Sequence, residues 1–182
     1  MDIQRRLEKI TSRTAVLYAM TALLVIFANP SGKACFFGLI VVAAGEALRF
    51  WATGHIMKNE ELTTSGPYAY IQSPMYLGSF IIATGLCIMD RNSVIWVIAA
   101  AVYFLAYIPR KQEKEWGRLE RLFGEAFLKY KKDVPYLIPS KTLPYADADT
   151  RPWSFAQVIE NNEHQVAIGV ALLAVFIMVR IF

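Results

Sequence analysis

Cysteine and histidine are scarce in this sequence, which contains two residues of each kind among 182. Cys35 and Cys87 both lie inside apolar segments, where small packing residues are more usual than a disulfide or a metal ligand. With only His55 and His164 besides, the sequence offers no cluster of the side chains that hold metal ions. We therefore expect neither a metal site nor redox chemistry.

Repeats and low-complexity tracts are absent as well, and the length is that of a single domain, residues 1–182. Apolar residues are in excess: 55% of the sequence is hydrophobic, and its mean hydropathy is +0.35. Several apolar runs reach or approach the roughly 17–25 residues that cross a bilayer; the runs are residues 15–29, 34–47, 75–89, 93–108 and 166–182. We expect an all-α integral membrane helical bundle with about five transmembrane helices.

The basic residues are distributed unevenly around these runs. Of the 19 lysines and arginines, all but Lys33, Arg91 and Arg180 precede the first run, follow the second, or lie between the fourth and the fifth. Because positive charge is enriched on the cytoplasmic side, we expect a cytoplasmic N-terminus and an external C-terminus. The net charge of +4 then reflects topology and anionic lipid headgroups, and nucleic acid is not expected as a partner.

Two of the runs carry glycines at a spacing of seven residues. Gly38 and Gly45 lie in the second run, and Gly78 and Gly85 lie in the third. Each pair places two small residues on one helix face, which predicts a close approach between helices.

Residues 110–133 are charged but periodic, and we expect amphipathic cytoplasmic helices here. Apolar side chains recur at helical spacing: Trp116, Leu119, Phe123, Phe127 and Tyr130. Gly124 interrupts the stripe and predicts a bend between two helices. A helix resting on the lipid surface would explain the stripe by itself.

The stretch GPYAYIQSPMYLGS, residues 66–79, leads into the third run. Ser73 followed by Pro74 predicts an N-cap and a first helical residue. The free N–H groups and the positive end of the helix dipole would then face the cytoplasmic boundary, which suits an anionic group such as a carboxylate. Alternatively, the two prolines merely turn the chain into the membrane.

Glu46 is a carboxylate inside or near the cytoplasmic end of the second run. Ionisable residues within membrane segments are costly and indicate a functional site. However, Arg49 is three residues away, so a structural ion pair within one helix is an equally valid interpretation.

Two separated blocks, LTTSGPYAYIQSPMYLGS and EWGRLERLFGEAFLKYKKDVPYLIP, resemble the isoprenylcysteine carboxyl methyltransferase family and its phospholipid methyltransferase relatives. That family has the pattern G-x-Y-x-[YWF]-x-R-[HN]-P-x-Y-x-G, followed by E-E-x-x-L-x-x-x-F-G and a V-P-x-x-[IL]-P ending. The resemblance covers about residues 45–139, which leaves residues 165–182 as an additional span.

The resemblance implies S-adenosylmethionine-dependent methyl transfer to a membrane lipid or a prenylated small-molecule acceptor, such as an isoprenylcysteine carboxylate. The implied positive position near the acceptor is Lys111 or its neighbour Arg110. The implied cofactor-binding residues are Lys58, Glu60, Glu61, Leu62, Thr63, Tyr68, Ser73, Pro74, Met75, Tyr76 and Glu115. Within this set, Glu115 would hold the cofactor's ammonium or ribose hydroxyls, and the helix start at Ser73 would receive its carboxylate.

The sequence departs from the family pattern at two places. Gln72-Ser73 stands where the family has Arg-His or Arg-Asn, and Trp116 replaces the second glutamate of the pair. These changes leave open a catalytically silent membrane scaffold of the same fold. A membrane reductase using a nicotinamide cofactor is a third interpretation, although the sequence has no glycine-rich dinucleotide fingerprint.

Overall fold

The computed structural model describes residues 29–57, 60–139 and 143–181. Every regular element in these ranges is helical, so the all-α prediction is confirmed for them. The elements are α2 (Gly32–Thr53), η1 (Gly66–Ala69), α3 (Pro74–Asp90), α4 (Ser93–Val102), η2 (Tyr103–Tyr107), α5 (Ile108–Asp133), α6 (Phe155–Glu160) and α7 (Glu163–Val179). The first apolar run, except for its last residue, lies outside the described residues.

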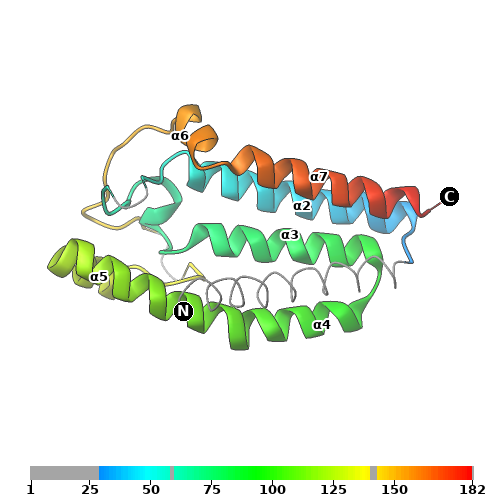
Figure 1. Cartoon of the computed structure of the whole chain (residues 1–182), viewed down its shortest axis with the longest axis horizontal. Coiled ribbons are helices and arrows are strands. Elements are labelled where there is room, and N and C mark those ends of the chain that lie inside the picture. The colour runs from blue at the N-terminus through cyan, green and yellow to red at the C-terminus, as the bar shows by residue number, and fades with distance from the viewer. Residues whose placement is uncertain (1–28, 58–59, 140–142, 182) are drawn as a thin grey trace, which may run out of the picture.

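The helices run along the long axis of the molecule (Figure 1). Helices α2, α3 and α7 lie side by side, and α4 follows α3 after a short turn. The helix that begins with α4 continues through η2 into α5, which extends past the other helices at one end. The same end carries η1, α6 and the connecting loops. The polar segments of the chain therefore gather at one end of an apolar bundle.

Two stretches are long and apolar enough to cross a membrane: α2, and the continuous helix Ser93–Asp133 made of α4, η2 and α5. In the second stretch the apolar part ends near Ile108, and charged residues follow from Arg110 onward. The apolar helices α3 and α7 have 17 residues each, or about 26 Å at the helical rise, somewhat less than a hydrocarbon core of roughly 30 Å. The number of about five spans therefore stays a prediction.

Helices α2 and α3 approach each other closely through their glycines, as their spacing predicts. A Cβ atom at Gly45 would lie 2.8 Å from the Gly78 carbonyl oxygen, and one at Gly85 would lie 2.7 Å from that of Gly38. Even alanine would force the helices apart at both crossing points. Buried residues of α7, among them Ile177, complete the same apolar core.

The bend predicted at Gly124 is present in α5. Gly124 has φ 52° and ψ −126°, a backbone conformation that only glycine adopts readily. After the bend, Phe127 and Tyr130 are buried against Val134, and the earlier part of the stripe packs on the same cluster. The apolar stripe thus faces the protein's own loops, and the interpretation of a helix resting on lipid is wrong for it.

Candidate functional site

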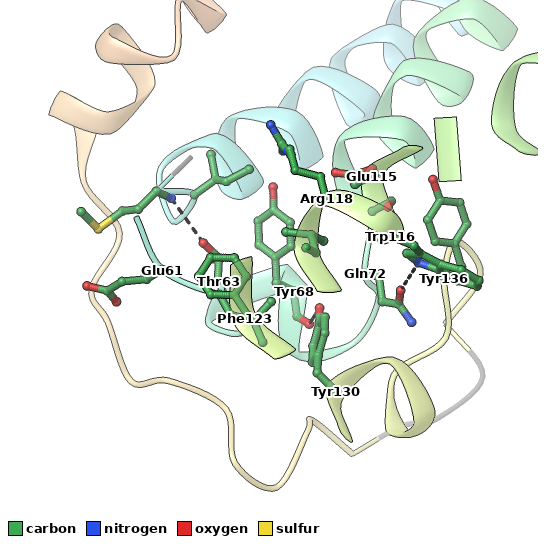
Figure 2. Close-up of a pocket in the computed structure, with 15 residues that line it drawn as sticks. Glu61, Thr63, Tyr68, Gln72, Glu115, Trp116, Arg118, Phe123, Tyr130 and Tyr136 are labelled. Carbon is green, nitrogen blue, oxygen red and sulfur yellow. Dashed lines mark hydrogen bonds between the residues drawn. The ribbon is translucent and has the colours of Figure 1, made fainter. Parts of the chain in front are cut away.

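A hollow lies at the polar end of the bundle, between α5 and the loops on either side of η1 (Figure 2). Its empty space, including the part open to solvent, is about 560 Å³. It is lined by Ile56, Met57, Glu61, Leu62, Thr63, Tyr68, Gln72, Ser73, Glu115, Trp116, Arg118, Leu119, Phe123, Tyr130 and Tyr136.

Backbone hydrogen bonds hold the walls of the hollow together. The N–H groups of Gln72 and Ser73 donate to the carbonyl oxygens of Pro135 (2.9 Å) and Tyr136 (3.0 Å). The Tyr130 hydroxyl donates to the Tyr68 carbonyl oxygen at 2.7 Å, and this bond is fully buried. The chain leading into α3 is therefore fixed against the chain that follows α5.

The predicted start of α3 is confirmed in its position but not in its hydrogen bonding. Ser73 is the N-cap residue and Pro74 is the first helical residue. The Ser73 side chain makes no capping hydrogen bond, because its backbone (φ −132°, ψ 62°) is outside the extended conformation that usually directs a cap side chain at the first turn.

Glu115 is the principal ionisable group within the hollow. Its Oε2 atom is buried and has no hydrogen-bond partner among the described residues. Burial raises the pKa of this carboxyl above its usual value, although the Tyr76 hydroxyl and the positive charges of Arg118 and Lys111 act in the opposite direction. A ligand that donates a hydrogen bond or carries positive charge would relieve both the unmet bond and the desolvation.

Tyr68 adds a second unmet polar atom. Its hydroxyl is buried and finds no hydrogen-bond partner within the described part of the chain, and burial holds the pKa of Tyr68 far above its usual value. Tyr68 is therefore a neutral group that can both donate and accept a hydrogen bond. Glu115 and Tyr68 both line the hollow (Figure 2). Their unpaired oxygen atoms can therefore form hydrogen bonds with a ligand there.

Six of the predicted cofactor residues line the hollow together: Glu61, Leu62, Thr63, Tyr68, Ser73 and Glu115. Glu60, Pro74, Met75 and Tyr76 are not among the lining residues, and neither is Arg110 or Lys111. The Lys111 ammonium instead lies 5.5 Å from the centroid of the Tyr107 ring. Lys58 is outside the described residues. The roles of all these residues remain predictions.

Several lining residues are absent from the predicted set, above all Gln72, Trp116 and Arg118. As a member of the apolar stripe, about 100° around the helix from Glu115, Trp116 is predicted from the sequence to point toward lipid or the bundle. That expectation is wrong, because Trp116 lines the hollow and its Nε1 atom donates to Gln72 Oε1 at 2.9 Å. The sequence does single out Gln72 and Trp116, because both are positions at which it departs from the family pattern.

Arg49 does not pair with Glu46, so the ion pair considered within α2 is also wrong. Arg49 binds Glu163 at the start of α7, with Nε–Oε1 and Nη2–Oε2 distances of 2.6 and 2.9 Å. A carboxylate on another helix can accept two parallel hydrogen bonds from the planar guanidinium, whereas a carboxylate three residues away on the same helix is less well placed to do so. Both Glu46 carboxylate oxygens are buried without a hydrogen-bond partner among the described residues.

Residues 33–126, just over half of the chain, match the family described as phospholipid methyltransferase. The chain belongs to this family. The matched residues include α2 except its first residue, the helices α3 and α4, and α5 as far as residue 126, which is the part that carries Glu115. The resemblance found in the two sequence blocks is thereby confirmed.

Individual members of the phospholipid methyltransferase family and similar proteins give a more detailed comparison. Human protein-S-isoprenylcysteine O-methyltransferase is 35% identical over 114 residues, which are 56% of this chain and 40% of the human protein. The Schizosaccharomyces pombe protein of the same name is 31% identical over 99 residues, 54% of this chain and 42% of that protein. The nickel-cobalt-cadmium resistance protein NccN of Alcaligenes xylosoxydans is 31% identical over 108 residues, 58% of this chain and 50% of that protein.

The chain therefore spans about 40% of the length of the methyltransferases that it matches. No solved structure matches it.

Proposed function

We propose that this protein is an S-adenosylmethionine-dependent membrane methyltransferase that acts at the cytoplasmic boundary of the bilayer. Its proposed acceptor is a lipophilic molecule of the isoprenylcysteine type, methylated on its carboxylate. The observation that carries the proposal is the hollow, where the Glu115 Oε2 atom, buried and without a hydrogen-bond partner among the described residues, lies among aromatic side chains. The isoprenylcysteine methyltransferases among the relatives support the choice of acceptor.

The residues present fit this cofactor. S-adenosylmethionine supplies a methyl group on a positively charged sulfur when it is bound. Glu115 offers a negative oxygen for the ammonium or the ribose hydroxyls, and the neutral Tyr68 hydroxyl offers a further polar contact. The first turn of α3 behind Ser73 offers the positive end of a helix dipole for the cofactor's carboxylate.

The acceptor requires little from the protein beyond positioning and charge. A carboxylate attacks without losing a proton, so no general base is needed, which agrees with the scarcity of histidine. Lys111 or Arg110 would attract the acceptor carboxylate toward the polar end of the bundle. Excluding water and aligning the reacting groups would then supply much of the rate enhancement.

A catalytically silent scaffold is the second candidate, since Gln72 and Trp116 replace charged residues of the family pattern. Their mutual hydrogen bond favours a pocket that keeps its shape without those charges. The scaffold and the enzyme differ in one measurable property, which is binding of the cofactor.

The test is calorimetric titration of the purified, detergent-solubilised protein with S-adenosylhomocysteine. We expect saturable binding, followed by transfer of labelled methyl from S-adenosylmethionine to an S-farnesylcysteine analogue. Absence of cofactor binding by the folded protein would refute the enzyme. Binding with transfer to a phospholipid amine, but not to the farnesylcysteine analogue, would refute the proposed acceptor and keep the enzyme class.

A further inference from the structure

We propose that Trp116 contacts the flat nucleoside base of the ligand in the hollow, and that Gln72 is the residue that positions Trp116. This inference rests on the proposed function, because it assigns parts of the same site to parts of the same cofactor. Neither residue belongs to the set that the family resemblance implied.

Three contacts fix the Trp116 side chain. Its indole Nε1 donates to Gln72 Oε1 at 2.9 Å. The Lys131 ammonium lies 3.8 Å from the centre of its ring, and the Tyr136 ring meets it edge-on at a centroid distance of 5.8 Å. An aromatic surface held in advance loses little entropy when a ligand packs on it.

Gln72 can orient the indole because its own amide is fully engaged. The Nε2 atom donates to the carbonyl oxygens of Val134 (2.5 Å) and Lys131 (3.3 Å). These two bonds determine which end of the amide faces Trp116, so that an acceptor oxygen meets the indole N–H. Gln72 thus links the loop before α3 to Trp116 within α5 and to the C-terminal end of the same helix, and it has no free donor left for a ligand.

The positions of the charged groups around the hollow favour Trp116 as the residue that contacts the nucleoside base of the ligand. Lys131 already places a positive charge over the Trp116 ring, so a second cation on this ring would be opposed by like charge. The Glu115 Oε2 atom, which no described residue pairs with, provides the better place for the positive end of a ligand. A neutral, flat ring suits the Trp116 wall, where Leu119 and Phe123 also line the hollow.

The experiment measures tryptophan fluorescence during titration with S-adenosylhomocysteine, beside calorimetry on the same samples. The chain has four tryptophans. Trp153 is the matched control because its indole also donates a hydrogen bond, in this case to the Phe50 carbonyl oxygen (3.1 Å), but does not line the hollow. We expect binding to change the fluorescence of the wild type and of Trp153→Phe. In Trp116→Phe this change should vanish, while binding persists about three- to tenfold more weakly.

The role of Gln72 is tested with Gln72→Met, which keeps the length of the side chain and removes its hydrogen bonds. We expect a similar loss of affinity, about three- to tenfold. If Gln72 acts through Trp116, the double variant Gln72→Met/Trp116→Phe should bind as Trp116→Phe does, whereas independent structural effects would add. Should Gln72→Met fail to fold, Trp116→Phe still decides the contact.

Failure of this inference can be separated from failure of the proposed function. If the wild type does not bind S-adenosylhomocysteine, the proposed function itself is wrong. If the wild type binds but shows no fluorescence change, or if Trp116→Phe keeps the full change, then Trp116 does not contact the base. If the double variant shows the sum of the two losses, Gln72 does not position Trp116.

Discussion

Arg49 and Glu163 are 114 residues apart in the sequence, yet they form a bidentate ion pair in which the Glu163 side chain is 2% exposed. The Arg49 guanidinium also donates to Ser79 Oγ (2.5 Å) and to the Met75 carbonyl oxygen (3.4 Å). One side chain of α2 thereby binds α7 and the first turns of α3. The contacts of Arg49 thus hold α7, which lies beyond the residues that match the family, against the start of α3 next to the hollow.

Removing Glu163 should therefore destabilise the whole bundle. Glu163→Ala leaves the Arg49 charge buried without its partner, which typically costs about 3–5 kcal/mol and should lower the apparent Tm by about 10 °C or more. Thermal unfolding of the detergent-solubilised protein measures the change. The control is Asp147→Asn, which breaks the solvent-exposed pair with Lys129 and should leave the Tm unchanged. Equal Tm values for wild type and Glu163→Ala would contradict the structural importance of the pair.

Glu115 should be the strongest single determinant of cofactor binding. Glu115→Gln keeps the size of the side chain and removes the charge, so a charge-assisted hydrogen bond worth roughly 1.5–3 kcal/mol is weakened. We expect S-adenosylhomocysteine to bind about tenfold to a hundredfold more weakly by calorimetry. Glu113→Gln is the matched control, because Glu113 is exposed on the same helix and does not line the hollow. If Glu113→Gln weakened the binding of S-adenosylhomocysteine as much, Glu115 would have no special role beyond that of a surface charge.

Cofactor affinity should also fall when the pH is lowered. Burial raises the pKa of Glu115 above its usual value of 4.5, so in the empty pocket this carboxyl takes up a proton at a higher pH than a free glutamate does. The same shift means that its protonated form stabilises the empty protein, and that this contribution is lost as the pH rises through the raised pKa. A cationic ligand group reverses the preference because it binds the charged form.

Calorimetry between neutral pH and the usual glutamate range measures this effect. We expect the affinity of the wild type for S-adenosylhomocysteine to decrease over that range as Glu115 is protonated. Glu115→Gln should bind weakly at every pH, without this step. A pH dependence that is identical in the two proteins would assign the titration to another group.

Topology can be tested with two exposed positions that the charge distribution places on opposite sides. Single cysteines are introduced into a background without Cys35 and Cys87. Lys33→Cys lies in the first turn of α2, at its predicted external end, whereas Glu113→Cys lies on the predicted cytoplasmic part of α5. Both residues are exposed in the structure. A membrane-impermeant maleimide added to intact cells should label Lys33→Cys and spare Glu113→Cys. The reverse pattern would overturn the predicted orientation.

The sequence by itself determined the features that depend on neighbours along the chain. Apolar runs and helical spacing identified α2, α3, α4, α5 and α7, whereas η1 and α6 were not predicted. Ser73-Pro74 located the start of α3, and Gly124 located the bend of α5. These features are local, because a helix is specified by a few turns of pattern and a positive φ needs only the right residue. The glycine spacing likewise predicted a close approach between helices, and the structure supplies the partners, because the glycines of α2 and α3 face each other.

Tertiary structure alone decided the contacts between distant segments. Arg49 has a carboxylate three residues away in Glu46, but the bidentate geometry of Glu163 on another helix takes its place. Trp116 faces the hollow because the chain around Gln72 and the chain after α5 enclose that part of the helix from two sides. Periodicity gives the angle between Glu115 and Trp116 around one helix; it contains no information about which loops will cover each face.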